Sequence, residues 1–199
     1  MEIYVSPITQ IVSEIRYISE QISLLIKSAD IIFKKNGFEP YSDSTSNVAG
    51  ERSGALDKPN EWFPEFFYRF YTSDVYEDVQ MYLSVILDNR DNNQSYDFKK
   101  PIVSAGYFLG HQESSKKVTQ DQSERCTWHV YADNKNYEGR MCVFNPDNKK
   151  KWSSSCKNFS ILKSNAFYLE DITSSEVLET KLLKPFFDDF KSEYNNYKD

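Results

Sequence analysis

The feature that most constrains this chain is a repeat of apolar residues near its N-terminus. Between residues 8 and 32, apolar side chains recur at alternating spacings of three and four. This spacing places them along one side of an α-helix. Ser6-Pro7 suits the beginning of such a helix, and Asn36-Gly37 suits its end. The pattern therefore predicts a helix over residues 7–35. Its repeating positions are Ile8, Ile11, Ile15, Ile18, Ile22, Leu25, Ala29 and Ile32.

This apolar stripe has two interpretations. Four heptads can form a coiled coil, either with a protein partner or with a second copy of the chain. However, Val12, Ile26 and Phe33 add a third apolar column beside the stripe. A stripe of that width is typical of a helix docked on its own domain, because a coiled-coil seam is narrower. We favour docking within the domain, while partner binding or homodimer formation through helix 7–35 stays open.

After the helix, the sequence contains a polar region, then a region of alternating and aromatic-rich runs, and finally a second helical pattern. Residues 38–60 are polar, show no periodicity and are expected to form a long loop. Residues 65–171 contain alternating and aromatic-rich runs separated by turns, which predicts an antiparallel sheet. Thr173 and Glu176 form a capping-box pattern ahead of a helix over 174–195, which Pro185 should kink. The expected strands in this region cover residues 65–72, 78–88, 101–110, 125–133, 139–145 and 158–171, and a short strand is expected at 2–5.

Together these elements indicate a single α+β domain over residues 1–199. The expected architecture is a curved antiparallel β-sheet packed against the long N-terminal helix, with a C-terminal helix kinked at Pro185. A chain of 199 residues can bury a core without disulfide bonds. Its three cysteines are too few for a disulfide framework, which favours a reducing, cytoplasmic location. No apolar run is long enough to cross a bilayer, so no membrane partner is expected.

The sequence contains few motifs that are typical of catalysis or cofactor binding. The chain has no phosphate-binding Gly-Lys-Ser/Thr loop, no dinucleotide glycine fingerprint and no nucleophile elbow. Cys126, His129, Cys142 and Cys156 invite comparison with a zinc site. On a strand over 125–133, however, the side chains of Cys126 and His129 would point to opposite faces and could not bind one ion. His111 is a loop residue that could act as a base. We therefore expect no metal site and no cofactor.

Acidic residues near the expected strand 78–88 support an alternative enzymatic hypothesis. They are Asp74, Glu77, Asp78, Asp88, Asp91 and Asp97. A calcium loop beginning at Asp88 fails because its sixth and twelfth positions are Asn93 and Lys99. The spacing Glu179-Thr180-Lys181 occurs in some nucleases, but here it falls in an expected helix. The alternative is thus a carboxylate- or metal-dependent nuclease or hydrolase with an unrecognised site.

The basic segment 145–163 supports a second alternative, nucleic-acid binding. Lysines can contact phosphates, and an indole ring can stack on a base. Residues 116–163 hold 10 basic and 5 acidic residues, although the whole chain has a net charge of −6 and should repel polyanions. The candidate binding residues are Lys149, Lys150, Lys151 and Trp152. The favoured function is nevertheless a non-enzymatic binding, regulatory or accessory domain that recognises a protein or a small ligand, since long polar loops and abundant aromatic residues suit recognition.

Overall fold

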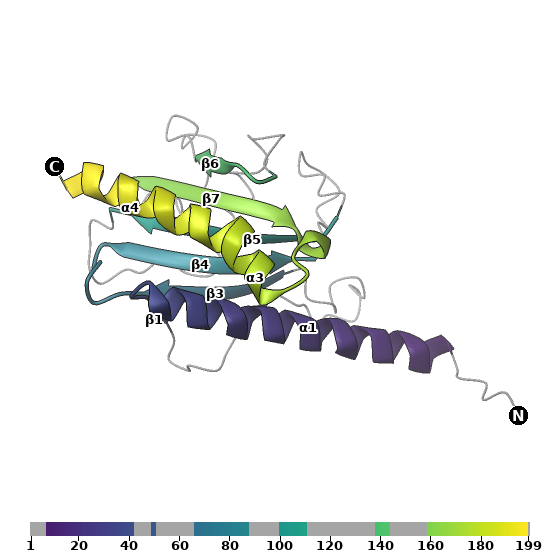
Figure 1. The fold of residues 1–199 in the computed structure, drawn as a ribbon. Helices are drawn as coiled ribbons and strands as arrows, with labels where there is room; N and C mark the ends of the chain where they lie inside the picture. The colour runs from purple at the N-terminus through teal and green to yellow at the C-terminus, as the bar shows by residue number, and fades with distance from the viewer. Residues whose placement is uncertain are drawn as a thin grey trace, which may run out of the picture.

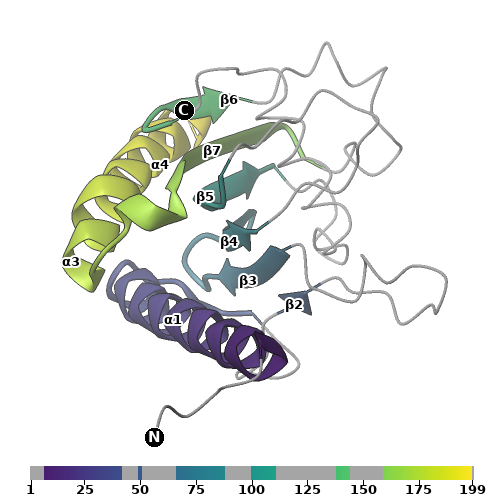
Figure 2. The ribbon, with the colours of Figure 1, turned by 90° about the vertical axis from the view of Figure 1, so that its right-hand side faces the viewer.

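The fold is seen in a computed structural model, which describes residues 7–41, 49–50, 66–87, 100–110, 138–143 and 159–198. A seven-stranded sheet lies at its centre, and helices from the two ends of the chain cover the same face of that sheet (Figure 1, Figure 2). Each helix packs an apolar stripe against the strands. The structure confirms the predicted α+β class, with an antiparallel sheet, a long N-terminal helix and a C-terminal helix.

The strands lie in the order β1-β3-β4-β5-β7-β6, with β2 also paired to β3. Neighbouring strands are antiparallel throughout. The central strands β4 and β5 are buried along their whole length, as their apolar runs require. The strand bounds are β1 (Glu39–Pro40), β2 (Ala49–Gly50), β3 (Phe66–Thr72), β4 (Val79–Ile86), β5 (Ile102–Leu109), β6 (Met141–Val143) and β7 (Ile161–Tyr168).

The structure differs from the expected strands at the edges of the sheet. Parts of the range 38–60, expected as one polar loop, form β1 and β2, because the edge of β3 offers unpaired backbone groups to any neighbouring segment. Of the strand expected at 139–145, the structure describes residues 139–143, in which β6 covers Met141–Val143 and pairs with β7. The strands expected at 2–5 and 125–133 lie outside the described residues, and so does most of the predicted loop.

The first helix, α1 (Pro7–Lys35), has the predicted bounds. The helix ends at Lys35, and Gly37, two residues later, has a φ of 85°, a left-handed conformation that glycine adopts without steric cost. After the short turn η4 (Leu169–Asp171), the C-terminal helix runs in three parts: α3 (Ser175–Val177), the π-helical segment η5 (Leu178–Leu183) and α4 (Lys184–Lys198). Its N-cap is Ser174, one residue after the expected Thr173, because the Ser174 hydroxyl accepts the Val177 N–H. A kink was expected at Pro185, which is the second residue of α4, and the π-helical segment η5 ends at Leu183, two residues before it.

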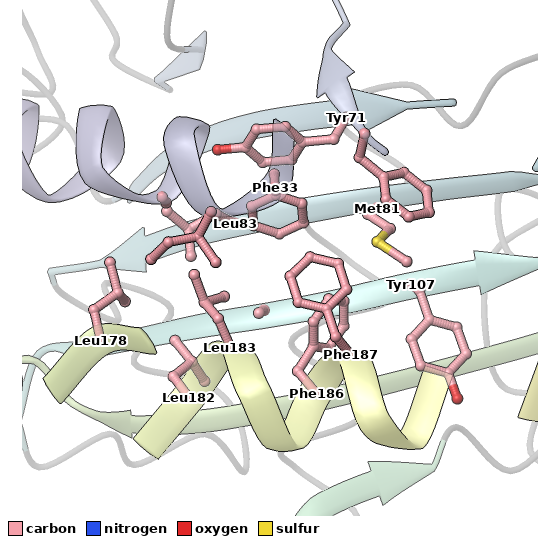
Figure 3. Close-up of a cluster of buried hydrophobic side chains, with 14 of the residues drawn as sticks. Phe33, Tyr71, Met81, Leu83, Tyr107, Leu178, Leu182, Leu183, Phe186 and Phe187 are labelled. Atoms are coloured by element: carbon pink, nitrogen blue, oxygen red, sulfur yellow. The ribbon is translucent and has the colours of Figure 1, made fainter. Parts of the chain in front are cut away.

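The main core lies between the two helices and the sheet. Figure 3 shows Phe33 of α1 beside Tyr71 of β3, with Phe186 and Phe187 of α4 facing them. These aromatic side chains fill the space where the helices and the strands meet, and each is buried. They belong to a larger apolar cluster that holds α1 and α4 against the sheet.

A buried ion pair fixes α1 on the sheet. Arg69 of β3 contacts Asp30 of α1 at 2.9 Å, and the Tyr71 hydroxyl donates a hydrogen bond to the same carboxylate at 2.8 Å. The Arg69 side chain is only 5% exposed, so the pair is largely removed from water. Burial, reinforced by the neighbouring carboxylate, raises the pKa of Tyr71 well above its usual value. These contacts hold α1 against β3 at Asp30.

Similar contacts fix α4. The Tyr107 hydroxyl of β5 donates to Asp189 at 2.7 Å, and Lys163 of β7 contacts Glu193 at 2.6 Å. Burial raises the pKa of Tyr107 far above its usual value, and Asp189 adds to this effect. Both helices are thus joined to the strands by packing and by polar contacts.

On the other face of the sheet, Tyr82 of β4 packs over Gly106, its direct neighbour on β5. A Cβ atom at Gly106 would lie 2.3 Å from atoms of the Tyr82 ring, so only glycine leaves room for this ring. The Tyr82 hydroxyl donates to Ser164 on β7 at 2.9 Å. The ring therefore links three adjacent strands.

Candidate functional site

Helix α1 consists of a docked half and an exposed half. Its buried residues all lie between Ile22 and Phe33. Every residue from 7 to 21 is exposed, except Ile15, which is half-buried. Figure 1 shows this half extending past the ends of the described strands. We call residues 7–21 the projecting half of α1.

The difference in length between helix and sheet explains the projecting half. A strand of eight residues spans about 26 Å, whereas a helix of 29 residues spans about 43 Å. The sheet can therefore cover only part of the apolar stripe. Of the predicted positions, Ile22 and Ile32 lie in the core, Leu25 and Ile15 are half-buried, and Ile8, Ile11 and Ile18 are 73%, 55% and 46% exposed. Docking within the domain accounts for the buried half of the helix. The apolar residues of the other half are exposed to solvent.

A further apolar column lies on the outer side of α1. Tyr17, Leu24 and Ile31 are spaced seven residues apart, and each is more than half exposed. This column was not predicted from the sequence, because the prediction considered only the apolar stripe expected to pack against the sheet. The seven-residue spacing was the signal that could have revealed it.

Part of this outer surface borders a groove of about 550 Å³. The groove lies between residues 17–28 of α1 and the segment 169–178, and we call it the α1 groove. Its surface is mostly apolar, and polar side chains border it. The apolar lining residues are Tyr17, Ile18, Ile22, Leu24, Leu25, Leu169, Ile172 and Leu178, and the polar ones are Gln21, Ser28, Glu170, Thr173, Ser174 and Ser175.

Backbone contacts hold the far wall of the α1 groove in position. The Leu169 N–H donates to the carbonyl oxygen of Pro101 at 2.8 Å, which ties η4 to the beginning of β5. The Ile172 N–H then donates to the Leu169 carbonyl oxygen at 3.1 Å, which closes the turn. An ion pair between Lys100 and Glu170 joins the same two segments and raises the pKa of Lys100. These contacts hold the wall against the beginning of β5.

The far wall is also acidic. Residues 169–180 contain four carboxylates and no lysine or arginine. Their side chains are Glu170, Asp171, Glu176 and Glu179, and all except Asp171 are exposed. Of these four side chains only Glu170 lines the groove, and it is paired with Lys100.

The other predicted sites do not assemble in the part of the chain that the structure describes. Lys149, Lys150, Lys151 and Trp152 lie outside it, as do Asp88, His111, Cys126, His129 and Cys156. Cys142 of β6 is buried, and burial raises the pKa of its thiol to about 11, which suppresses thiolate chemistry. Glu179 and Lys181 are exposed on η5. Within the described ranges, no three His, Cys, Asp or Glu side chains are placed to bind a metal ion.

Comparison of the chain with protein-family models, with curated proteins and with solved structures finds no match. In the described ranges, the helices lack a stretch apolar and long enough to span a bilayer. The functional argument therefore rests on the α1 groove and on the exposed residues of α1.

Proposed function

We propose that this protein is a non-enzymatic, regulatory or accessory binding domain that receives an amphipathic helix of a protein partner in the α1 groove. The main support for the proposal is that exposed apolar residues of α1 also border the α1 groove. Tyr17, Leu24 and Ile18 are substantially exposed where they border the groove. Exposed apolar residues gathered at one place are typical of interaction sites.

The shape of the surface favours a helix over a compact ligand. The groove runs beside 12 residues of α1, from Tyr17 to Ser28, or about 18 Å of helix. A helix lying in such a groove presents apolar residues at every third or fourth position. The exposed apolar residues continue beyond the groove to Ile11 and Ile8 at the tip of α1. A long partner matches this extent better than a small molecule, which would contact only the groove.

A display library of helical peptides tests the proposal. Each peptide has a fixed apolar stripe and variable charges on its other faces, and the purified protein is used at low concentration. We expect selected peptides to lose at least about tenfold in affinity with Leu24→Asp, since burying one leucine contributes about 2 kcal/mol. Leu24 is 55% exposed, so this substitution should not unfold the domain.

Val75→Asp is the matched control. Val75 is 75% exposed and lies in the turn between β3 and β4, so a charge there should leave peptide binding unchanged. Peptides that bind equally well to the wild type and to Leu24→Asp would contradict the proposal. A library that yields no binding peptide would also contradict it.

A further inference from the structure

We propose that the α1 groove selects a partner helix whose bound face is apolar and uncharged, and that the π-helical segment η5 gives the groove this preference. This inference rests on the proposed function and names the chemistry of the partner. η5 acts by determining which residues of the C-terminal helix face the groove.

The lining of the α1 groove carries almost no charge. Among the described residues that line it, Glu170 is the only charged one, and it is paired with Lys100. Glu20 and Lys27 belong to the stretch of α1 that borders the groove, but neither of them lines it. A charged side chain that entered the groove would lose contact with water without gaining an unpaired opposite charge. The lining therefore disfavours a partner helix with charges on its bound face.

The segment η5 changes the register of the C-terminal helix by one residue. The Lys184 N–H at its end donates to the carbonyl oxygen of Glu179, five residues earlier. Before η5, the Leu178 N–H donates to the carbonyl oxygen of Ser174, four residues earlier. A π-helical turn thus holds more residues than an α-helical turn. Each residue before η5 consequently faces the direction that the next residue would face in an unbroken α-helix.

This change of register decides the chemistry of the groove wall. The residues of the C-terminal helix and its N-cap that line the groove are Ser174, Ser175 and Leu178. In an unbroken α-helix, the same three directions would be taken by Ser175, Glu176 and Glu179. Two carboxylates would then face the groove. With η5 in place, both glutamates are exposed and neither lines the groove.

The neighbouring residues Leu178 and Glu179 explain why the helix contains η5. Leu178 is 1% exposed and packs in the main core with Leu182 (Figure 3). In an unbroken α-helix, Glu179 would take the place of Leu178, and its charge would be buried. π-helical turns are rare and are found frequently at functional sites. The core therefore selects the register, and the register keeps the groove uncharged.

Exchanging these two residues tests the role of η5. The double variant L178E/E179L has the composition and net charge of the wild type, but its leucine lies one position later. We expect its C-terminal helix to become an unbroken α-helix, with the leucine at position 179 in the core and Glu176 facing the groove. Urea unfolding should show that the double variant is more stable than L178E alone, because the leucine returns to the core.

Peptide selection then measures the preference of the groove. The library consists of helical peptides with glutamine, glutamate or lysine at the positions that border the apolar stripe. We expect the wild type to select glutamine at these positions, and lysine there to weaken binding by about tenfold. The folded L178E/E179L variant should select lysine instead, because its groove contains a carboxylate.

A second variant changes the charge of the wall without changing the core. Ser175 is exposed and lines the groove, so Ser175→Glu should also move the selection from glutamine to lysine. Thr180→Glu is the matched control. It adds the same charge at an exposed position of the same helix that does not line the groove, and it should select the same peptides as the wild type.

The results separate this inference from the proposed function. Selection of lysine-bearing peptides by the wild type overturns the uncharged face, and so does an unchanged selection by Ser175→Glu. An L178E/E179L variant that is no more stable than L178E, or that is folded and keeps the wild-type selection, overturns the role of η5. In each of these cases, peptides that still lose affinity with Leu24→Asp leave the proposed function standing. A wild type that selects no peptide overturns both proposals.

Discussion

The rings of Phe33 and Tyr71 are stacked face to face, with centroids 3.7 Å apart and planes 1° from parallel. Phe33 comes from the docked half of α1, and Tyr71 comes from β3. The stacked pair marks the place where the first helix is held against the sheet, and Asp30 binds the Tyr71 hydroxyl at the same place.

Truncating Phe33 should therefore weaken the whole domain. We expect Phe33→Ala to lower the free energy of unfolding by about 3–5 kcal/mol, since it removes the ring and leaves a cavity. Phe33→Leu keeps most of the volume and should cost about half as much. Urea unfolding followed by circular dichroism measures both values. Tyr17→Ala on the exposed side of α1 is the control and should change stability by less than about 0.5 kcal/mol.

Removing Arg69 should be costly because it leaves Asp30 without its cation. We expect Arg69→Leu to destabilise the domain by about 3 kcal/mol, at the lower end for buried pairs because Asp30 is 24% exposed. The double variant Arg69→Leu/Asp30→Leu should cost less than the sum of the single variants. Lys34→Ala removes the exposed Lys34–Glu39 pair and should cost less than about 1 kcal/mol. Additive costs at positions 30 and 69 would argue against direct coupling.

A methyl group at Gly106 should collide with the Tyr82 ring. We expect Gly106→Ala to destabilise the domain by about 1–3 kcal/mol through overpacking. In a Tyr82→Leu background, Gly106→Ala should destabilise the domain clearly less, because the atoms that the new methyl group would contact belong to the Tyr82 ring. Thermal unfolding of the four chains in this cycle measures the coupling. Equal costs in both backgrounds would show that the backbone at Gly106, rather than the ring, requires glycine.

Stability should fall at high pH because two buried phenols resist ionisation. The raised pKa values of Tyr71 and Tyr107 mean that their contribution is complete below the unfolded value near 10 and is lost as the pH rises above it. Each group should remove up to about 1.4 kcal/mol per pH unit above 10. Urea unfolding at pH 8 and pH 11 should show a smaller loss for Tyr107→Phe than for the wild type. An equal loss in both chains would indicate that Tyr107 ionises normally in the folded state.

The local elements were readable from the sequence because they depend on nearby residues. Helix 7–35 has its own start and stop signals, and the long strands carry dense aromatic and β-branched runs. The edge strands β1 and β2 were not predicted, because two residues carry no periodic signal. They form only where β3 presents an edge.

The α1 groove could not be predicted because its walls are distant in the sequence. Leu24 and Leu169 line the same groove, yet no local pattern relates them. The sequence also does not reveal where the sheet ends beneath a helix. Whether Ile18 is buried or exposed depends on that boundary, and both interpretations of the stripe were consistent with the sequence.

The exposure of residues 7–21 has a consequence for how this protein can evolve. Substitutions there scarcely affect the core, so selection on folding leaves them largely free. Selection for binding to a partner can act on the same positions without opposing selection for folding. A lineage could therefore change its partner by replacing a few isoleucines in one helical segment, while the sheet and α4 stay as they are.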